Sequence, residues 1–255
     1  MLFSFSFLIP IFVGFVYEES SINIFISLMI GIFLVGCCSW VFTRKDGSDL
    51  SLSDGFIITV LFWLVLSLFG ALPFYFLGFS FVDSLFESMS GITTTGATVF
   101  SGLDELDKSV LIYRQLLQWM GGMGLIVLAI AVMPLLGIGG GQLFKTQTPG
   151  AMSNQKLTPR ITNTARALWL IYLGLTILCL SSYKLAGMSF FDSFAHALST
   201  VSIGGFSTHD SSIGFFNNIN IDSLRIYSNN RETVIAGKSQ KIDTNFFNEQ
   251  ELKNK

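Results

Sequence analysis

The sequence contains few charged side chains and few of the residues that bind metals. Charged residues make up only 13% of the 255 residues, and the net charge of −2 is too small to indicate a nucleic-acid partner. The three cysteines, Cys37, Cys38 and Cys179, lie inside apolar segments and form no C-x-x-C pair, which favours packing over a metal or redox site. The two histidines, His196 and His209, match no metal-binding spacing, so we expect capping or packing roles and no cofactor.

Three further absences narrow the class of protein. No basic segment precedes the apolar residues 2–17 and no A-x-A pattern follows them, so we expect a short span rather than a cleaved signal peptide. The glycine-rich segment 137–142 lacks the last glycine of G-x-G-x-x-G, which argues against a nucleotide-binding loop. No G-x-S-x-G elbow surrounds Ser207 and no acid stands at a suitable place to orient His209, so an intramembrane hydrolase, or any enzyme, is disfavoured.

Apolar residues dominate what remains. Hydrophobic residues make up 51% of the sequence, and the mean hydropathy is +0.60. Apolar stretches of about 18 or more residues predict membrane-spanning helices. The sequence therefore predicts an all-α polytopic membrane protein, and small residues at Gly121–Gly124 predict close helix packing inside one span. The predicted spans lie at about residues 2–17, 22–43, 55–79, 109–137 and 165–187.

Two segments, Phe81–Thr98 and Phe190–Ser207, carry the same pattern without a gap. Each predicts a short helix, at about 82–92 and 191–201, followed by a loop rich in hydroxyls and glycine. Such helices are too short to cross a bilayer, so we predict re-entrant half-helices that lead into pore loops. An ordinary external loop is the alternative for either copy alone. The identical pairs are Phe81/Phe190, Asp83/Asp192, Ser84/Ser193, Ser90/Ser199 and Gly96/Gly205.

The loops have the composition of a cation filter. A cation that leaves water must exchange its hydration shell for protein oxygens, which backbone carbonyls supply without net charge. Glycine permits the positive φ that turns carbonyls inward, and hydroxyl side chains add oxygens. We predict that the cation, as the transported substrate, meets mainly backbone carbonyls of Thr93, Thr94, Thr95, Gly96 and Ala97 and of Ser202, Ile203, Gly204, Gly205 and Phe206.

The first residues of each short helix determine the electric field at its other end. Ser84 and Glu87 match a capping box, or Asp83 caps the helix alone, and Asp192 with Ser193 is expected to cap the second helix likewise. Each helix would begin near the outer surface and end at mid-membrane. Its negative C-terminal end would then point at the ion and favour a cation.

Basic residues predict the orientation in the membrane. We expect Arg44–Lys45 and the connection 141–166 in the cytoplasm, together with the N-terminus, because Lys and Arg gather in these short connections. Both pore loops would then face outside. Arg114 and Gln118 lie one turn apart near the outer end of a span, where they either snorkel or pair with an acid such as Glu87.

The end of the sequence breaks the repeat. The span at 109–137 should recur at about 218–246, but that window carries several charges, each of which costs about 3 kcal/mol at a helix centre. We therefore expect a polar, disordered tail and a second unit without its closing span. The predicted organisation is two extra spans (1–54), a first span–loop–span unit (55–140), a cytoplasmic connection (141–164), an incomplete second unit (165–221) and the tail (222–255).

These segments resemble the Trk/Ktr/HKT superfamily of potassium transporters, most closely the N-terminal half of a bacterial Trk-type membrane subunit. The likeness lies in residues 86–98, 113–125 and 203–210, with 169–172 also matching, and it covers about residues 1–220. The order and spacing of these blocks make the resemblance specific. It implies four span–pore loop–span units, preceded by two extra spans, whose four loops build one potassium filter.

The resemblance also implies partners and a location. Family members form homodimers, bind a cytoplasmic nucleotide-binding regulatory subunit and lie in the bacterial cytoplasmic (inner) membrane. Gly96 and Gly205 would be the central filter glycines, and a glycine in the first loop goes with potassium whereas a serine goes with sodium. The third and fourth units are absent from this sequence, and the abrupt change of composition near residue 222 is typical of a frameshifted, split or truncated reading frame.

Two hypotheses follow. The chain is either part of a potassium-uptake subunit, completed by a second copy or by a second chain that carries the missing units, or a non-conducting remnant or modulatory fragment of such a transporter.

Overall fold

The computed structural model describes residues 2–43, 52–132 and 157–216, and all regular structure within these ranges is helical. The prediction of an all-α membrane fold with two half-helices is confirmed, because α4 and α8 contain only 12 residues each. The elements are η1 (Leu2–Phe7), α1 (Leu8–Tyr17), α2 (Ile22–Thr43), α3 (Leu52–Phe76), α4 (Phe81–Ile92), η2 (Leu103–Glu105), α5 (Lys108–Val132), α7 (Leu157–Leu185), α8 (Phe190–Val201) and η4 (Ser212–Phe216).

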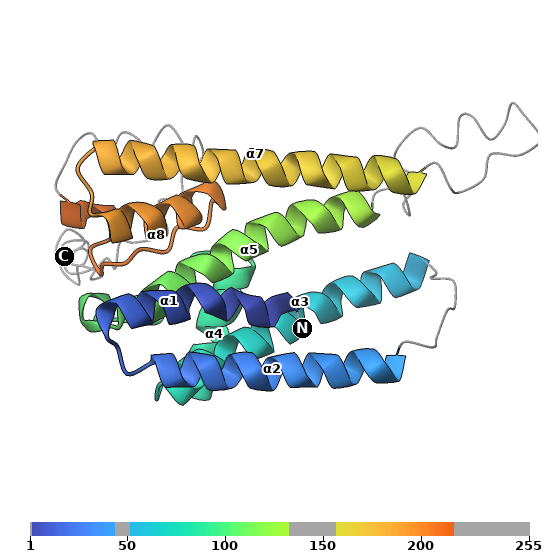
Figure 1. Cartoon of the computed structure of the whole chain (residues 1–255), viewed down its shortest axis with the longest axis horizontal. Helices are drawn as coiled ribbons and strands as arrows, with labels where there is room; N and C mark the ends of the chain where they lie inside the picture. Colours follow the sequence, from blue (N-terminus) through green and yellow to red (C-terminus); the bar gives the residue numbers. More distant parts are fainter. Residues whose placement is uncertain (1, 44–51, 133–156, 217–255) are drawn as a thin grey trace, which may run out of the picture.

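The long helices run side by side along the longest axis of the molecule (Figure 1). The short helices α4 and α8 lie toward the end at which α1 turns into α2 and α5 begins (Figure 1). Helix α3 packs against α4, α7 packs against α8, and α5 packs against both short helices. Helix α5 is therefore the element that joins the two similar pairs.

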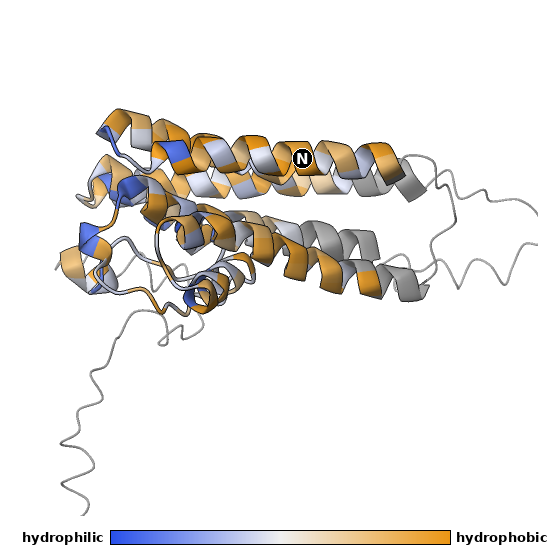
Figure 2. Ribbon diagram, turned by 90° about the horizontal axis from the view of Figure 1, so that it is seen from below, coloured by the Kyte–Doolittle hydropathy of each residue, from blue (hydrophilic) through white to orange (hydrophobic). Residues whose placement is uncertain are grey.

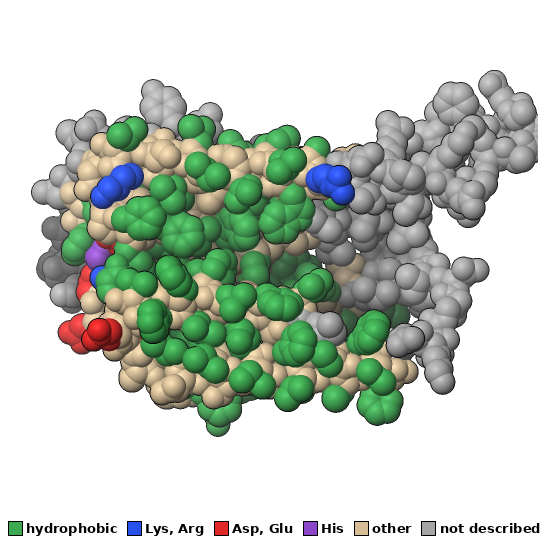
Figure 3. Space-filling view, viewed as in Figure 1, with side chains coloured by type: hydrophobic (Ala, Val, Ile, Leu, Met, Phe, Trp, Pro, Cys, Tyr) green, Lys and Arg blue, Asp and Glu red, His purple; other side chains and the backbone are tan. Residues whose placement is uncertain are grey.

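The outer surface suits a bilayer. Within the described ranges three segments are long and apolar enough to cross a membrane, Ile22–Phe42, Thr59–Phe76 and Thr164–Leu185. Apolar residues follow the long helices (Figure 2), and apolar side chains cover much of the face drawn in Figure 3, where the acidic side chains lie at one end. The first apolar segment is shorter, but its 3₁₀ turn rises more per residue, so η1 and α1 together extend roughly 27 Å.

Several predictions fall on residues that the structure does not describe. These are Arg44–Lys45, the segment 137–142, most of the connection 141–166 and the tail 222–255. Helix α7 begins at Leu157, earlier than the span predicted from residue 165, because the helix continues on the N-terminal side of its apolar stretch.

A buried aromatic cluster joins α5 to the N-terminal helices. The ring of Tyr113 lies 5.5 Å from the rings of both Phe7 and Phe25 and 5.3 Å from that of Phe74, measured between centroids. The hydroxyl of Tyr113 donates a hydrogen bond to the Gly70 carbonyl at 3.0 Å. Because the polar end of this buried side chain is satisfied, the cluster fixes α5 against η1, α2 and α3 without an unpaired group.

Small residues let α5 approach its neighbours closely, as predicted. A Cβ atom on Gly121 would lie 1.9 Å from the carbonyl oxygen of Ile92, at the end of α4. A Cβ atom on Gly122 would lie 2.8 Å from the hydroxyl of Tyr172 on α7. Gly124 has more room, since its nearest contact is 3.9 Å away.

We expect Gly121→Ala to abolish accumulation of the folded protein, because the added methyl group would overlap backbone rather than a movable side chain. Gly174→Ala is the matched control, since Gly174 is also helical but has no atom within 4 Å of the added Cβ. That change should be neutral, or stabilising by about 1 kcal/mol. Size-exclusion profiles and thermal melting in detergent measure both variants, and a folded Gly121→Ala protein would contradict the expectation.

Candidate functional site

Both half-helices begin with the same serine–aspartate cap. The Ser80 hydroxyl accepts the Asp83 N–H at 3.1 Å and donates to the Asp83 carboxylate at 2.7 Å. Ser189 and Asp192 repeat the arrangement at 3.0 and 2.6 Å. Each cap satisfies an N–H that the helix leaves unpaired and places a carboxylate at its positive end.

The predicted caps were therefore wrong. The helices begin at Phe81 and Phe190, which puts the preceding serine at the cap and the aspartate in the first turn. Ser84 and Ser193 lie one turn further on and are buried. The other member of the predicted capping box, Glu87, is fully buried in a different role.

The two predicted filter loops have the same backbone conformation. Thr94 and Gly96 have φ angles of +56° and +77°, and the equivalent Ile203 and Gly205 have +58° and +90°. The left-handed region disfavours Thr and Ile, so it persists at those positions only where surrounding contacts enforce it. The repeat therefore extends from the residue pattern to the backbone itself.

Hydrogen bonds anchor the start of each loop to its own half-helix. Thr95 N–H donates to the Ser90 carbonyl at 2.9 Å, and the equivalent Gly204 N–H donates to the Ser199 carbonyl at 2.9 Å. No backbone carbonyl of residues 94–97 or 203–206 accepts a hydrogen bond from another described residue. These oxygens are thus available to a ligand, as a carbonyl filter requires.

A buried ion pair holds the far side of the first loop. Arg114 on α5 and Glu87 on α4 are fully buried, with Nη2 2.6 Å and Nε 2.7 Å from the same carboxylate oxygen. The carboxylate also accepts bonds from the Thr98 hydroxyl at 2.9 Å and the Val99 N–H at 3.1 Å. The predicted pairing of Arg114 with a pore-helix acid is confirmed, and the alternative of snorkelling is excluded.

The same guanidinium reaches the second loop. Arg114 Nη1 donates to the Ser207 carbonyl at 3.1 Å, and its carbon lies 4.5 Å from the centre of the Phe206 ring. Arg114 Nη2 also donates to the Thr98 hydroxyl at 3.0 Å. A single side chain thus fixes the distance between Thr98 and Ser207, which are equivalent positions of the two repeats.

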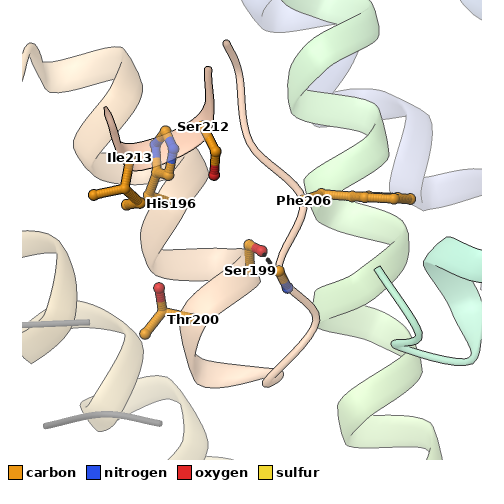
Figure 4. A pocket seen from close by; sticks show the side chains of 7 residues that line it. His196, Ser199, Thr200, Phe206, Ser212 and Ile213 are labelled. Atoms are coloured by element: carbon orange, nitrogen blue, oxygen red, sulfur yellow. Dashed lines mark hydrogen bonds between the residues drawn. The ribbon is translucent and has the colours of Figure 1, made fainter. Parts of the chain in front are cut away.

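Gln118 holds the second loop one turn further along α5. Its amide oxygen accepts the Ser199 hydroxyl at 2.8 Å and the Phe206 N–H at 3.1 Å. The Ser199 hydroxyl in turn accepts the Gly205 N–H at 3.0 Å, the bond drawn dashed in Figure 4. A Cβ on Gly204 would lie 2.3 Å from the Gln118 amide carbon, so glycine is required there. The sequence indicated Gln118 only loosely, and it predicted Gly204 as a filter carbonyl without any signal of its contact with Gln118.

The second repeat replaces the buried acid with histidine. His196 occupies the position of Glu87, and its Nε2 lies 3.0 Å from the hydroxyl of Ser207, the counterpart of Thr98. Its Nδ1 lies 2.9 Å from the Asp192 carbonyl. The packing role predicted for this histidine is confirmed. Figure 4 shows the ring beside a cavity of about 20 Å³, which has room for about one water molecule behind the second loop.

His209 links the segment after the first loop to the beginning of the second half-helix. Its Nδ1 contacts the carboxylate of Asp104 in η2, its Nε2 lies 3.4 Å from an Asp192 oxygen, and its ring stacks on Phe215 at 3.6 Å. Burial alone would lower the pKa of His209, but the two carboxylates outweigh it and raise the pKa above the ordinary 6.5. The expectation that no acid orients His209 was wrong, because the acids come from other segments; its ring still makes no contact that would form a hydrolase triad with Ser207.

The raised pKa makes stability depend on pH. The contribution of charged His209 to the free energy of unfolding is complete below its ordinary pKa of 6.5. It is lost as the pH rises through the raised pKa that His209 has in the folded protein. We expect the melting temperature of the wild type to fall above neutral pH, and His209→Gln to remove that part of the dependence. Melting curves between pH 5 and about 9 test this; equal slopes for both proteins would contradict it.

Two buried glutamines on α5 give a matched pair of variants. Both are fully buried, but Gln118 makes the bonds just described, whereas neither amide atom of Gln115 has a partner among the described residues. Gln118→Leu should cost about 2 kcal/mol, because it leaves Ser199 and the Phe206 N–H unpaired. Gln115→Leu should be neutral or stabilising. Thermal melting measures both, and equal losses would refute a specific role for Gln118.

Known proteins are similar to this chain in sequence. Residues 20–228 match the family TrkH, described as a cation transport protein. The Trk system potassium uptake protein TrkH of Vibrio parahaemolyticus is 48% identical over 228 residues, which are 88% of this chain and 47% of that protein. TrkG of Escherichia coli (strain K12), also named a Trk system potassium uptake protein, is 48% identical over 220 residues, 85% of this chain and 45% of that protein.

A solved structure agrees. The crystal structure of the potassium transporter TrkH from Vibrio parahaemolyticus superposes with a TM-score of 0.77 at 45% identity, over 89% of this chain and 46% of that chain. The chain therefore spans about half the length of the curated relatives it matches. The family match and these identities confirm the resemblance seen in the sequence: the chain belongs to the TrkH family of cation transport proteins.

Proposed function

We propose that this chain forms part of the wall of a potassium-uptake pore, with potassium as the transported substrate. The observation that carries the proposal is the pair of loops at 93–97 and 202–206, which share one unusual backbone conformation and leave their carbonyls unpaired among the described residues. Each loop follows a half-helix whose negative end favours a cation nearby. The relatives' names give the ion.

The remaining wall comes from another polypeptide segment. The Ser199 hydroxyl in the second repeat bonds to Gln118, from the helix that precedes its unit. The equivalent Ser90 hydroxyl is buried and has no partner among the described residues. A helix that presents a hydrogen-bonding side chain to Ser90 would satisfy it.

The resemblance to Trk-type subunits supports a proposal for the partners and the location. We propose a homodimeric assembly, or a complex with the chain that carries the missing units, and contact with a cytoplasmic nucleotide-binding regulatory subunit. The site would be the bacterial cytoplasmic (inner) membrane, with the N-terminus inside and both loops outside. Under this orientation the caps at Ser80 and Ser189 face outward and the half-helices end at mid-membrane.

Rubidium-86 influx tests the function. The chain is expressed in cells that lack potassium uptake, alone and together with the C-terminal half of a full-length relative. We expect influx well above background only in the pair. Absence of influx in both cases would remove the claim of conduction and leave the alternative, a non-conducting or modulatory fragment, which reduced uptake by a co-expressed intact subunit would identify.

Gly96→Ser tests the filter. Gly96 has φ +77°, and Gly102 has nearly the same angle, +72°, but lies outside the loop with no atom within 4 Å of an added Cβ. Gly102→Ser is therefore the matched control, because both substitutions add comparable backbone strain, about 1–2 kcal/mol. We expect only Gly96→Ser to lower the ratio of rubidium to sodium uptake in the reconstituted pair. Equal ratios for the two variants would argue against a filter at 93–97.

A further inference from the structure

The turn between α1 and α2 contains Glu19, whose carboxylate caps the beginning of α5. Glu19 accepts the backbone N–H groups of Lys108 and Ser109, the first two residues of α5, at 2.7 and 3.0 Å. Beside it the buried hydroxyls of Ser21 and Ser109 lie 2.8 Å apart. The contact joins residues 89 and 90 positions apart in the sequence, so it is a tertiary contact and not a local turn.

This cap fits the chemistry of a helix beginning. The first N–H groups of a helix have no partner within it, and the aligned peptide dipoles leave positive charge there. A carboxylate that accepts two of these N–H groups satisfies both needs at once. The backbone of the turn is itself well defined. Glu18 takes the left-handed conformation at φ +55°, and the Glu19 N–H donates to the Gly14 carbonyl at 3.0 Å.

The capped helix is the one that holds both loops. Arg114 and Gln118 lie in the turns of α5 that follow Glu19's partners, and they fix loops that follow two different half-helices. A helix moves nearly as a rigid rod, so a shift or fraying at Lys108 would change where both side chains meet the loops. The stacking of Tyr113 on Phe7 holds α5 against the same N-terminal hairpin from the side.

We propose that Glu19 is a positioning residue for the filter, and that the N-terminal hairpin η1–α1–α2 serves as the brace that sets the axial position of α5 and so the spacing of the two loops. This rests on the proposed function of the loops. It gives the two extra N-terminal helices a role beyond anchoring the chain in the membrane.

The chain offers a matched control. Glu18 precedes Glu19, carries the same charge and is exposed. Glu19→Gln keeps one oxygen acceptor and removes the charge, Glu19→Ala removes both, and Glu18→Gln changes only the net charge. If the charge at this end of the molecule were the whole effect, Glu18→Gln and Glu19→Gln would behave alike.

The first readout is structural and needs no conduction. Spin labels are placed at Val99, just after the first loop, and at Ile203, in the second loop, which are 46% and 60% exposed. The labels are introduced into the full chain with its three cysteines replaced by serine. We expect Glu19→Ala to shift or broaden the distance distribution between the labels, Glu19→Gln to do so less, and Glu18→Gln to leave it unchanged. A wild-type distribution in folded Glu19→Ala would overturn the proposal.

The second readout separates positioning from general stability. The melting temperatures of the wild type and the variants are measured with added potassium or added sodium, and the rise that each ion causes is compared. The apparent affinity for an ion falls with the fraction of protein in the competent arrangement. We therefore expect the loss of this cap to weaken the potassium response by about fivefold, the factor that a typical cap contributes. A lower melting temperature with an unchanged potassium response would show a merely structural role and overturn the proposal. No response in the wild type would refute potassium binding, and the label distances would still decide the role of Glu19.

Discussion

The buried side chain of Arg114 is the contact on which the arrangement of the two repeats depends. Its guanidinium bonds to Glu87 and Thr98 in the first repeat and to Ser207 in the second, and it lies against the ring of Phe206. A buried charge is costly unless it is paired and its remaining donors are used, and removal of one partner from such a pair typically costs about 3–5 kcal/mol. The enclosed charge therefore leaves the two loops few alternative spacings.

The repeats share a framework and differ in chemistry. Both use a serine–aspartate cap, a half-helix and two left-handed residues in the loop. The first repeat then fills the space behind its loop with an acid that needs the arginine, whereas the second uses His196, a side chain that can be neutral. Arg114 on α5 thus balances Glu87 in the first repeat. Among the described residues, the second repeat places no further buried acid that would need a second cation.

Contacts from outside the repeats complete the frame. The N-terminal hairpin meets the beginning of α5 through Glu19, and His209 joins Asp104 and Asp192 at the same end of the molecule. Glu19 and His209 are charged groups in partly exposed positions, where ion pairs alone stabilise a protein weakly. Their effect comes from geometry, since each joins segments about 90 or more positions apart in the sequence.

The sequence by itself determined the helices, the two half-helices and the loops. Long apolar runs specify spans because lipid offers backbone no hydrogen bonds, and the shared pattern of Phe81–Thr98 and Phe190–Ser207 specified equivalent structures. The cap predicted from the sequence lay a few residues too late. Ser80 and Ser84 are equally good cap residues, and only the true start of the helix distinguishes them.

Only the tertiary structure decided which side chains hold the loops. Gln118 meets Ser199 across 81 positions and Arg114 meets Ser207 across 93, and nothing in the local pattern of α5 specifies such partners. The same holds for His209, whose acids come from two other segments. Local sequence fixes hydrogen bonds within a turn or helix, whereas pairings between distant segments depend on how the packed helices are placed.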